Sequence, residues 1–349
     1  MSSETPNGPW LIGGPGRCGK THLAETLWEH AGPVAGFPLE GLFTVYSKRW
    51  LYGSRQMRED LVEEYVARPR YIDADRKKTE KPAQYFKSTP TQLRQSLPSN
   101  RRHPVAIIGW ILDCFASENE CRTWAAFDLH PEFRYTFFRK HIPGAKLAVM
   151  VRDPHEAIAA ALFWRGNPGT GVERDVRFKH SLIMYCLAVR VARALARRWP
   201  QDVRIFDLNA LCDGHDAELA SLSSTFGIAP AIARRSFDFT PHFQLDERKE
   251  FLLPDGERAT LLTSTERAEI SVLTNLDGQI GSRARTGFLL TARFILVLAD
   301  ISPGLARGAG NITYYPLRTV TRLINSARRL ILDLRRLPKS FRTANGRTG

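Results

Sequence analysis

Three features that would identify a protein class at once are missing from this sequence: paired cysteines, a long apolar run and a basic leader. The five cysteines are odd in number and form no C-x-x-C pair, which argues against a zinc site and a disulfide framework. The apolar stretch 286–301 is short and is interrupted by Arg293 and Asp300, so it does not suit a bilayer span. The first residues do not resemble a signal peptide. We therefore expect a cytoplasmic protein in a reducing compartment.

Positive charge is abundant but unevenly spread. The chain carries 50 Lys and Arg against 36 Asp and Glu, a net charge of +14. From residue 303 onward there are ten basic residues and one acid, Asp333, which accounts for nine of those fourteen charges. The basic character therefore belongs mainly to a C-terminal tail.

Within this tail, residues 316–337 repeat apolar side chains at a spacing of three and four, with arginines off that stripe. The pattern predicts a cationic amphipathic helix. It would either pack on the domain or lie on an anionic membrane, at the inner face of the cell membrane. We do not expect nucleic acid as a partner, because no aromatic residues interleave the arginines to stack on bases.

The most informative stretch is Gly14-Pro-Gly-Arg-Cys-Gly-Lys-Thr21, which fits the Walker A phosphate-loop pattern G-x-x-x-x-G-K-[ST] in full. An apolar strand candidate, 10–12, precedes it, and helical spacing of apolar residues follows over 21–28. This strand-loop-helix context is the one that the pattern requires.

Each position of the loop has a physical role. Gly14, Gly16 and Gly19 allow the backbone to curl so that its N–H groups face a phosphate, and the next helix points its positive end at the same anion. Lys20 would place its charge on the outer phosphates, and Thr21 would ligate Mg²⁺ where a metal is used. The sequence therefore predicts nucleotide binding at this loop.

Short apolar runs separated by helical patterns indicate the fold. The runs that we predict to be parallel strands are 10–12, 105–112, 146–151 and 203–206. Strands that alternate with helices, such as the one expected at 181–198, favour a parallel sheet with helices on both faces. We expect an α/β fold of the phosphate-loop type, with three α/β/α layers, a mainly parallel central sheet and a helical C-terminal extension.

The predicted organisation follows from these patterns. Residues 1–8 would be a flexible N-terminus, and 9–285 the phosphate-loop domain, with a charged, proline-rich insertion on the substrate side at 37–104. Residues 286–337 would form the helical extension and 338–349 a disordered basic tail.

A second group of residues follows the predicted strand 146–151. Arg152-Asp153-Pro154 stands at its carboxyl end, before a helical pattern. In an open parallel sheet this edge is where ligands bind, and a guanidinium there is suited to a phosphate. Arg152 would either bind a second phosphate of the ligand or pair with Asp153.

The order of these motifs resembles that of the sulfotransferases. A phosphate loop near the N-terminus is followed about 130 residues later by P-x-A-K-x-x-x-x-V-R-D-P-x-x-A, which begins at Pro143. Further on, Val203-Arg-Ile-Phe-Asp-Leu-Asn-Ala-Leu211 and a helix that leads into Gly227 are similar to later family segments. The resemblance covers about residues 10–230.

The resemblance implies 3′-phosphoadenosine 5′-phosphosulfate as the donor. The positions that would hold its 5′-phosphosulfate are Arg17, Cys18, Gly19, Lys20 and Thr21. Arg152 would bind the 3′-phosphate. Ala160 stands where the family has a serine, so one ligand of that phosphate is missing. Arg165 or Lys179 would have to replace it.

Sulfuryl transfer also needs a base for the acceptor hydroxyl and a cation for the leaving phosphate. Lys20 would supply the cation. His130 is the candidate base, because it precedes Pro131 in a segment that resembles a histidine-containing segment of one family branch. The acceptor would be a hydroxyl of a small molecule, glycan or lipid.

A second interpretation is an ATP-dependent small-molecule kinase. Lys20 and Thr21 complete an ATP-type loop, and Asp113 follows the predicted strand 105–112. A carboxylate there would hold Mg²⁺ together with Thr21, although Asp113 is equally suited to cap a helix. A third interpretation is a nucleotide-binding protein without transferase chemistry. The sulfotransferase interpretation includes no resident metal.

Overall fold

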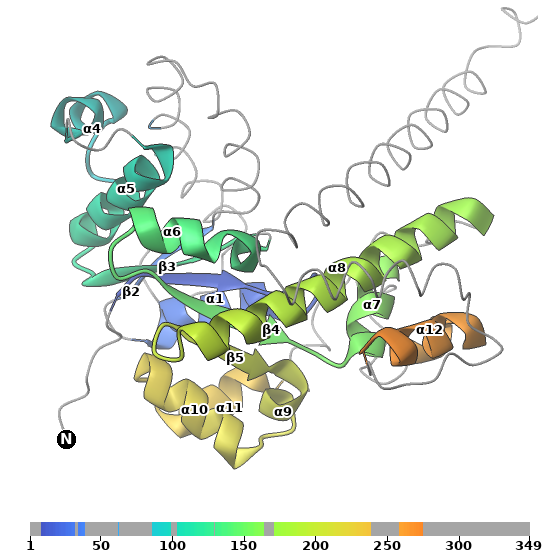
Figure 1. Ribbon diagram of the computed structural model, residues 1–349. Coiled ribbons are helices and arrows are strands. Elements are labelled where there is room, and N and C mark those ends of the chain that lie inside the picture. The colour runs from blue at the N-terminus through green and yellow to red at the C-terminus, as the bar shows by residue number, and fades with distance from the viewer. Residues whose placement is uncertain are drawn as a thin grey trace, which may run out of the picture.

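The chain folds around one parallel five-stranded sheet with the strand order β2-β3-β1-β4-β5 (Figure 1). The computed structural model describes residues 8–31, 34–38, 62, 86–98, 103–128, 130–163, 171–238 and 258–274. The predicted α/β fold class with a parallel central sheet is confirmed. The extension at 286–337, with its amphipathic helix, and the tail at 338–349 lie outside the described residues, as does most of the insertion at 37–104.

The described elements have the following bounds. The strands are β1 (Trp10–Gly13), β2 (Val34–Pro38), β3 (Thr123–Phe127), β4 (Lys146–Val151) and β5 (Val203–Asp207). The longer helices are α1 (Lys20–His30), α5 (Pro104–Glu118), α7 (Pro154–Phe163), α8 (Gly171–Arg198), α10 (Asp216–Phe226) and α12 (Ser264–Thr274). The shorter ones are α4 (Pro90–Ser96), η2 (Pro131–Arg134), α6 (Tyr135–His141), α9 (Leu208–Cys212), α11 (Pro230–Phe237) and η5 (Arg258–Leu261).

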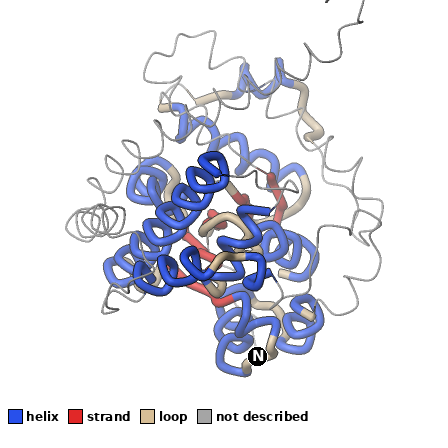
Figure 2. The backbone as a smooth tube through the Cα atoms, turned by 90° about the vertical axis from the view of Figure 1, so that its right-hand side faces the viewer, coloured by secondary structure: helices blue, strands red, loops and turns tan. Residues whose placement is uncertain are grey.

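The sheet separates two layers of helices. Because crossovers between parallel strands are right-handed, α1 lies on one face, while α5, α6 and α8 lie on the other (Figure 1). The strands run through the middle of the molecule, between the helices (Figure 2). The layers exclude water from the space between sheet and helices. Large side chains of both are therefore fully buried, among them Trp124, Tyr135, Phe115, Phe138, Phe178 and Phe206.

β1 occupies the centre of the sheet and places the phosphate loop between two neighbours. Its residue Ile12 pairs with Phe127 of β3, and Gly13 pairs with Val149 of β4. All three strands are parallel, so their carboxyl ends meet at one edge. Whatever follows β3 and β4 therefore lies beside the loop that follows β1.

The predicted strand at 105–112 is wrong, because these residues belong to α5. Pro104 occupies the first turn, and the His103 side chain accepts a hydrogen bond from the Val105 amide at 3.2 Å, which caps the helix. Ile107, Ile108, Ile111 and Leu112 are all fully buried. A helix that is apolar over so much of its surface shows no clear 3.6-residue period, so a short part of it looks like a buried strand.

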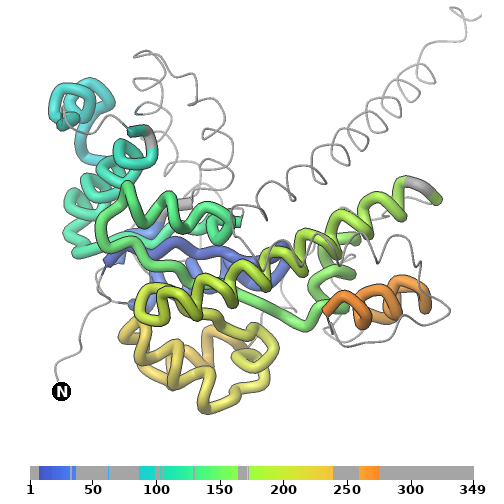
Figure 3. Tube along the Cα trace, in the orientation of Figure 1, coloured from blue at the N-terminus to red at the C-terminus, as the bar shows by residue number. Residues whose placement is uncertain are grey.

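The structure confirms three of the predicted strands, those at 10–12, 146–151 and 203–206. It also confirms the helices predicted after the loop and after Arg152. β2 and β3 were not predicted. β2 holds small residues and Pro38, which weaken a strand pattern, and β3 is only five residues long. α12 packs against α7 and α8 beside the carboxyl end of β4 (Figure 3).

Candidate functional site

The phosphate loop forms the predicted turn between β1 and α1. Gly14 has φ +123° and Gly19 has φ +81°, values that favour glycine. A Cβ at Gly14 would lie 2.1 Å from the carbonyl oxygen of Met150 in β4, so no side chain fits there. The non-glycine residue Arg17 also has a positive φ, +65°. Local backbone demands thus explain the glycines at both ends of the loop.

The outer side of the loop is open, and Lys20 lies across it. A Cβ at Gly16 would meet no atom within 4 Å, and Gly16 and Thr21 are both exposed. The Lys20 ammonium donates a hydrogen bond to the carbonyl oxygen of Gly14 at 2.9 Å. A cation and exposed backbone therefore stand at the positively charged end of α1, where an anion is favoured.

Glu132 is a site residue that the sequence analysis missed. Its side chain is buried, with Oε2 accepting a hydrogen bond from the Gly14 amide at 3.1 Å and Oε1 2.8 Å from His130 Nδ1. Burial raises the pKa of this carboxyl, but the hydrogen bond with His130 and the charge of Lys20 outweigh burial and hold it below its usual range. A carboxylate thus links the loop to the candidate base.

His130 is linked to the loop through Glu132. It follows β3 in the left-handed conformation, with φ +56°, and its side chain is 21% exposed. Its polar contact among the described residues is the one with Glu132. The structure thus brings His130 and Lys20 to the same edge of the sheet, on either side of Glu132.

Asp128 takes the position at which the sequence analysis expected Asp113. It follows β3 directly, its side chain is buried, and its amide donates to the carbonyl oxygen of Ile12 at 3.2 Å, next to the loop. A carboxylate at the end of the strand beside the phosphate-loop strand is typical of Mg²⁺-dependent NTPases. The apolar run 123–127 followed by an acid was the signal that could have identified it.

The expectation that placed Asp113 at the end of a strand is wrong. Asp113 lies within α5, is exposed, and accepts a hydrogen bond from Trp124 Nε1 at 2.9 Å. Trp124 stands near the amino end of β3, at the sheet edge opposite the loop. The structure therefore does not bring Asp113 to Thr21. Among the described residues, no three His, Cys, Asp or Glu side chains form a group that could hold a metal ion.

Arg152 leaves the carboxyl end of β4 and is only 6% exposed. One guanidinium nitrogen lies 3.6 Å from Glu156 Oε2, one turn along α7. The Tyr185 hydroxyl of α8 donates to the Arg152 carbonyl oxygen. The alternative in which Arg152 pairs with Asp153 is therefore wrong about the partner, because Arg152 pairs with Glu156. Asp153 instead caps α7 by accepting a hydrogen bond from the Glu156 amide at 3.0 Å.

Arg152 and the loop lie at the same sheet edge. The charge of Arg152 accordingly affects the pKa of Cys18, a residue of the loop. The Cys18 thiol is fully buried inside the loop and donates to the carbonyl oxygen of Gly16 at 3.7 Å. Burial raises the pKa of this thiol to about 12, and the positive charges of Lys20 and Arg152 act against that rise. Lys20 at the start of α1 and Arg152 after β4 are therefore both close enough to act electrostatically on this buried thiol.

We expect native Cys18 to resist iodoacetamide at about pH 8, because the thiolate is the reactive form and a buried thiol of raised pKa supplies little of it. Peptide mass mapping after timed exposure measures the rate. The partly exposed Cys121 is the internal control. Labelling of Cys18 as fast as Cys121 in the folded protein would contradict this assignment.

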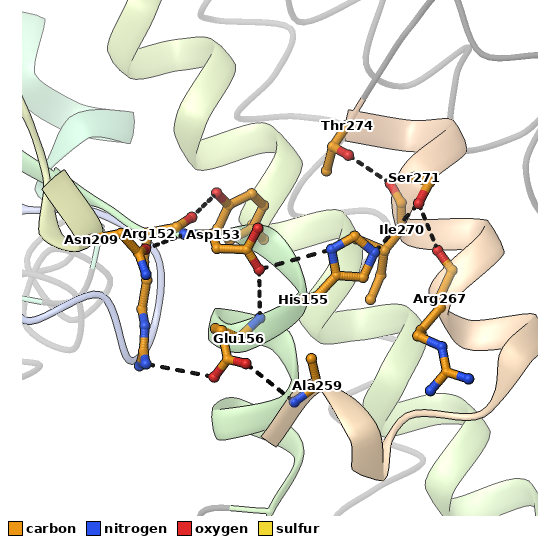
Figure 4. A network of polar contacts seen from close by, with 11 residues as sticks. Arg152, Asp153, His155, Glu156, Asn209, Ala259, Arg267, Ile270, Ser271 and Thr274 are labelled. Atoms are coloured by element: carbon orange, nitrogen blue, oxygen red, sulfur yellow. Dashed lines mark hydrogen bonds and ion pairs between the residues drawn. The ribbon is translucent and has the colours of Figure 1, made fainter. Parts of the chain in front are cut away.

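A polar network links residues 152–156 to three other elements, α9, η5 and α12 (Figure 4). The Asp153 amide donates to Asn209 Oδ1 of α9 at 2.8 Å. Glu156 Oε1 accepts from the Ala259 amide of η5 at 3.3 Å, and His155 Nε2 lies 3.3 Å from Ser271 Oγ of α12. The segment that carries Arg152 is therefore held rigidly.

Of the two residues predicted to replace the missing family serine, the structure describes Lys179 alone. Ala160 is buried in α7 and has no hydroxyl to offer. Lys179 forms an ion pair with Asp175 at 2.7 Å within α8. Arg165 lies outside the described residues.

The ion pair between Asp153 and His155 at the start of α7 depends on pH. The side-chain interaction with Asp153, 3.8 Å away, raises the pKa of His155 and lowers that of Asp153. Protonated His155 therefore stabilises the fold below about pH 6.5, an effect lost as pH rises through the raised pKa. Ionised Asp153 stabilises above about pH 3.9, an effect lost as pH falls through the lowered pKa.

Accordingly, the His155→Gln substitution should lower the melting temperature. The decrease relative to wild type should be largest between about pH 4 and 6.5, and small at about pH 9. Both side chains are partly exposed, so the effect should stay below about 1 kcal/mol. Thermal unfolding of both proteins across this range measures it. A difference that does not vary with pH would contradict the ion pair.

Comparisons with known proteins give little beyond the fold. No family model matches the chain, and no curated protein matches it. Among solved structures, the sulfotransferase domain from the Synechococcus PCC 7002 olefin synthase is similar, with 13% identity and a TM-score of 0.42, over 84% of this chain and 96% of that chain. At this TM-score the likeness says nothing of the activity of this chain. In the described part of the chain, no helix has the length and apolar character needed to cross a membrane.

Proposed function

We propose that this chain is a nucleotide-dependent transferase that moves a sulfuryl group from 3′-phosphoadenosine 5′-phosphosulfate to a hydroxyl acceptor. One observation carries the proposal: the buried Arg152 lies at the same sheet edge as the phosphate loop, where its charge and that of Lys20 act on Cys18. Two separate cationic positions suit a nucleotide with phosphates at both its 5′ and 3′ ends.

The residues present fit such a donor. The open outer side of the loop at Gly16, its backbone N–H groups and Lys20 would hold the 5′-phosphosulfate. The guanidinium of Arg152 would hold the 3′-phosphate, in competition with Glu156. A rigid segment around Arg152 keeps the spacing between the two positions fixed, which favours one nucleotide geometry.

The proposed reaction needs one proton acceptor and one stabilised leaving group. His130 would take the proton of the acceptor hydroxyl, whose oxygen then forms the new bond to sulfur. The bond between sulfur and the 5′-phosphate oxygen breaks, and its electron pair stays on that phosphate. Lys20 and the loop amides would stabilise the added negative charge.

A kinase that uses ATP and Mg²⁺ is the second candidate, and one observation favours it. Asp128 provides a buried carboxylate directly after β3, the strand beside β1, and Thr21 stands at the start of α1. Together with Lys20 these are the parts of an ATP-type site. Asp128 now takes the role that Asp113 had in this interpretation.

Thermal unfolding with each nucleotide tests the proposal. 3′-Phosphoadenosine 5′-phosphate in EDTA, at about 100 times its Kd, should add about 2.7 kcal/mol and raise the melting temperature by roughly 5 °C. Stabilisation by ATP only with Mg²⁺, and its loss on Asp128→Asn, would instead establish the kinase. Stabilisation by neither nucleotide would contradict both enzymes.

The acceptor and any membrane contact rest on regions outside the described residues. We propose that the predicted helix at 316–337 brings the enzyme to anionic membranes, where a lipid or glycan acceptor would be reached. Sedimentation of the full chain with anionic and with neutral vesicles tests this. Equal binding to both, or to neither, would contradict it.

A further inference from the structure

Glu132 joins two parts of the site that lie far apart in the sequence, the phosphate loop at Gly14 and the candidate base His130. Its Oε2 accepts from the Gly14 amide at 3.1 Å, and its Oε1 lies 2.8 Å from His130 Nδ1. The carboxylate is 1% exposed. It therefore connects the first residue of the phosphate loop to the candidate base through one rigid, buried group.

Proton placement at His130 follows from the charge of Glu132. The pKa of Glu132 is held below its usual range, so both of its oxygens are acceptors and neither donates. The contact with Nδ1 is a hydrogen bond only if Nδ1 carries the proton. In neutral His130 the lone pair must then be on Nε2, which has no hydrogen-bond partner among the described residues.

The surroundings are shaped to accept this buried carboxylate. A Cβ at Gly13 would lie 2.6 Å from Glu132 Oε2 and 2.7 Å from Pro131 Cγ. Gly13 has no positive φ, so its backbone conformation does not require glycine. It also stands before the phosphate-loop pattern, so the motif does not require glycine there. Room for Glu132 explains it. A buried charge is costly unless it is paired, and the Glu132 carboxylate has two partners, the Gly14 amide and His130 Nδ1.

We propose that Glu132 is a positioning residue that holds His130 in the Nδ1–H tautomer and presents Nε2 as the base. The assignment of Nε2 as a base for an acceptor hydroxyl rests on the proposed function, whereas the tautomer rests on the geometry alone. Because the same carboxylate binds the Gly14 amide, the base is held at a fixed place relative to the loop that binds the donor.

Glu132→Gln tests the proposal with little change of shape. The glutamine carbonyl would take over the hydrogen bond from the Gly14 amide, so its NH₂ group would face Nδ1 and donate to it. The proton of neutral His130 would then move to Nε2. The variant keeps the contact with the loop but reverses the tautomer, which a merely structural role of Glu132 would not do.

Nitrogen NMR of the full-length protein labelled with ¹⁵N-histidine measures the tautomer directly. His130→Gln identifies the resonance among the nine histidines. We expect a protonated Nδ1 in the wild-type protein and a protonated Nε2 in the Glu132→Gln variant, above the pH at which the ring is cationic. Glu118→Gln, which removes a carboxylate that accepts from the Lys87 amide at 2.6 Å, is the matched control and should leave this resonance unchanged.

Two outcomes would overturn the proposal: a proton on Nε2 in the wild-type protein, or the same tautomer in wild type and E132Q. The wild-type spectrum alone decides the first, even if the variant does not fold. Failure of the proposed function would show elsewhere, as absent binding of 3′-phosphoadenosine 5′-phosphate, and would leave the tautomer result standing. In E132Q that nucleotide should bind within about threefold of wild type, since the loop contact is kept.

Discussion

Arg152→Ala is expected to weaken binding of 3′-phosphoadenosine 5′-phosphate by at least about 30-fold while leaving adenosine 5′-phosphate nearly unchanged. The guanidinium is 6% exposed and would pair with the 3′-phosphate in a desolvated place. Loss of one member of such a pair costs about 2–5 kcal/mol, and each 1.4 kcal/mol is a factor of about ten. Calorimetric titration with both nucleotides measures the two affinities.

The fold needs a separate control, because Arg152→Ala leaves the buried Glu156 without the cation 3.6 Å away. Arg152→Gln keeps a neutral donor toward Glu156 and should show the same selective loss. Arg139→Ala removes an arginine paired with Asp202 at 2.9 Å, toward the opposite sheet edge, and should change neither affinity. Equal weakening of both nucleotides by Arg152→Gln would contradict a 3′-phosphate contact.

Lys20→Met should weaken binding of both nucleotides by roughly 10–100-fold, because in the proposed site its ammonium would contact the 5′-phosphate that they share. Hydrogen bonds that involve a charged group contribute about 1.5–3 kcal/mol, which corresponds to this range. Lys20 lies on the loop, 2.9 Å from the Gly14 carbonyl oxygen. The same titrations measure the effect, so the two substitutions separate the two ends of the nucleotide.

Lys146→Met is the matched control for the lysine. Lys146 begins β4 at the opposite edge of the sheet, with its ammonium 5.5 Å from the centre of the Trp10 ring. It should leave both affinities unchanged. A Lys20→Met protein that binds both nucleotides as wild type does would show that the loop is not the phosphate site.

Local signals made much of the site predictable. The phosphate loop is a short motif whose glycines have local conformational reasons, and Gly14 and Gly19 do have positive φ values. Arg152 follows a short strand whose four central residues are buried, so its place at the edge of the sheet could be predicted from the pattern alone. The sequence therefore predicts that the loop and the segment around Arg152 lie at the same edge of the sheet.

The acidic residues were not predictable in the same way. Asp113 was assigned to the site because α5 is buried over most of its surface, which removed the helical period from the sequence. Asp128 was missed because β3 was missed. Glu132 gave no local signal, since what defines it is burial and a hydrogen bond to Gly14, 118 residues earlier.

The kinase and sulfotransferase interpretations differ most clearly in what the nucleotide must carry. A sulfotransferase site needs the 3′-phosphate and no metal, whereas a kinase site needs Mg²⁺ and the outer phosphates of ATP. Arg152 would bind the 3′-phosphate in the first case, and Asp128 would hold the Mg²⁺ in the second. A measurement of which nucleotide binds, and of whether Mg²⁺ is needed, therefore distinguishes the two interpretations.

The central claim, that the loop and Arg152 bind the two ends of one nucleotide, is tested most directly by titration of the wild-type protein. In EDTA, 3′-phosphoadenosine 5′-phosphate should bind at least about 30-fold more tightly than adenosine 5′-phosphate, and Mg²⁺ should not change either affinity. Equal affinities for the two nucleotides, with tight binding of ATP that appears only with Mg²⁺, would contradict the claim.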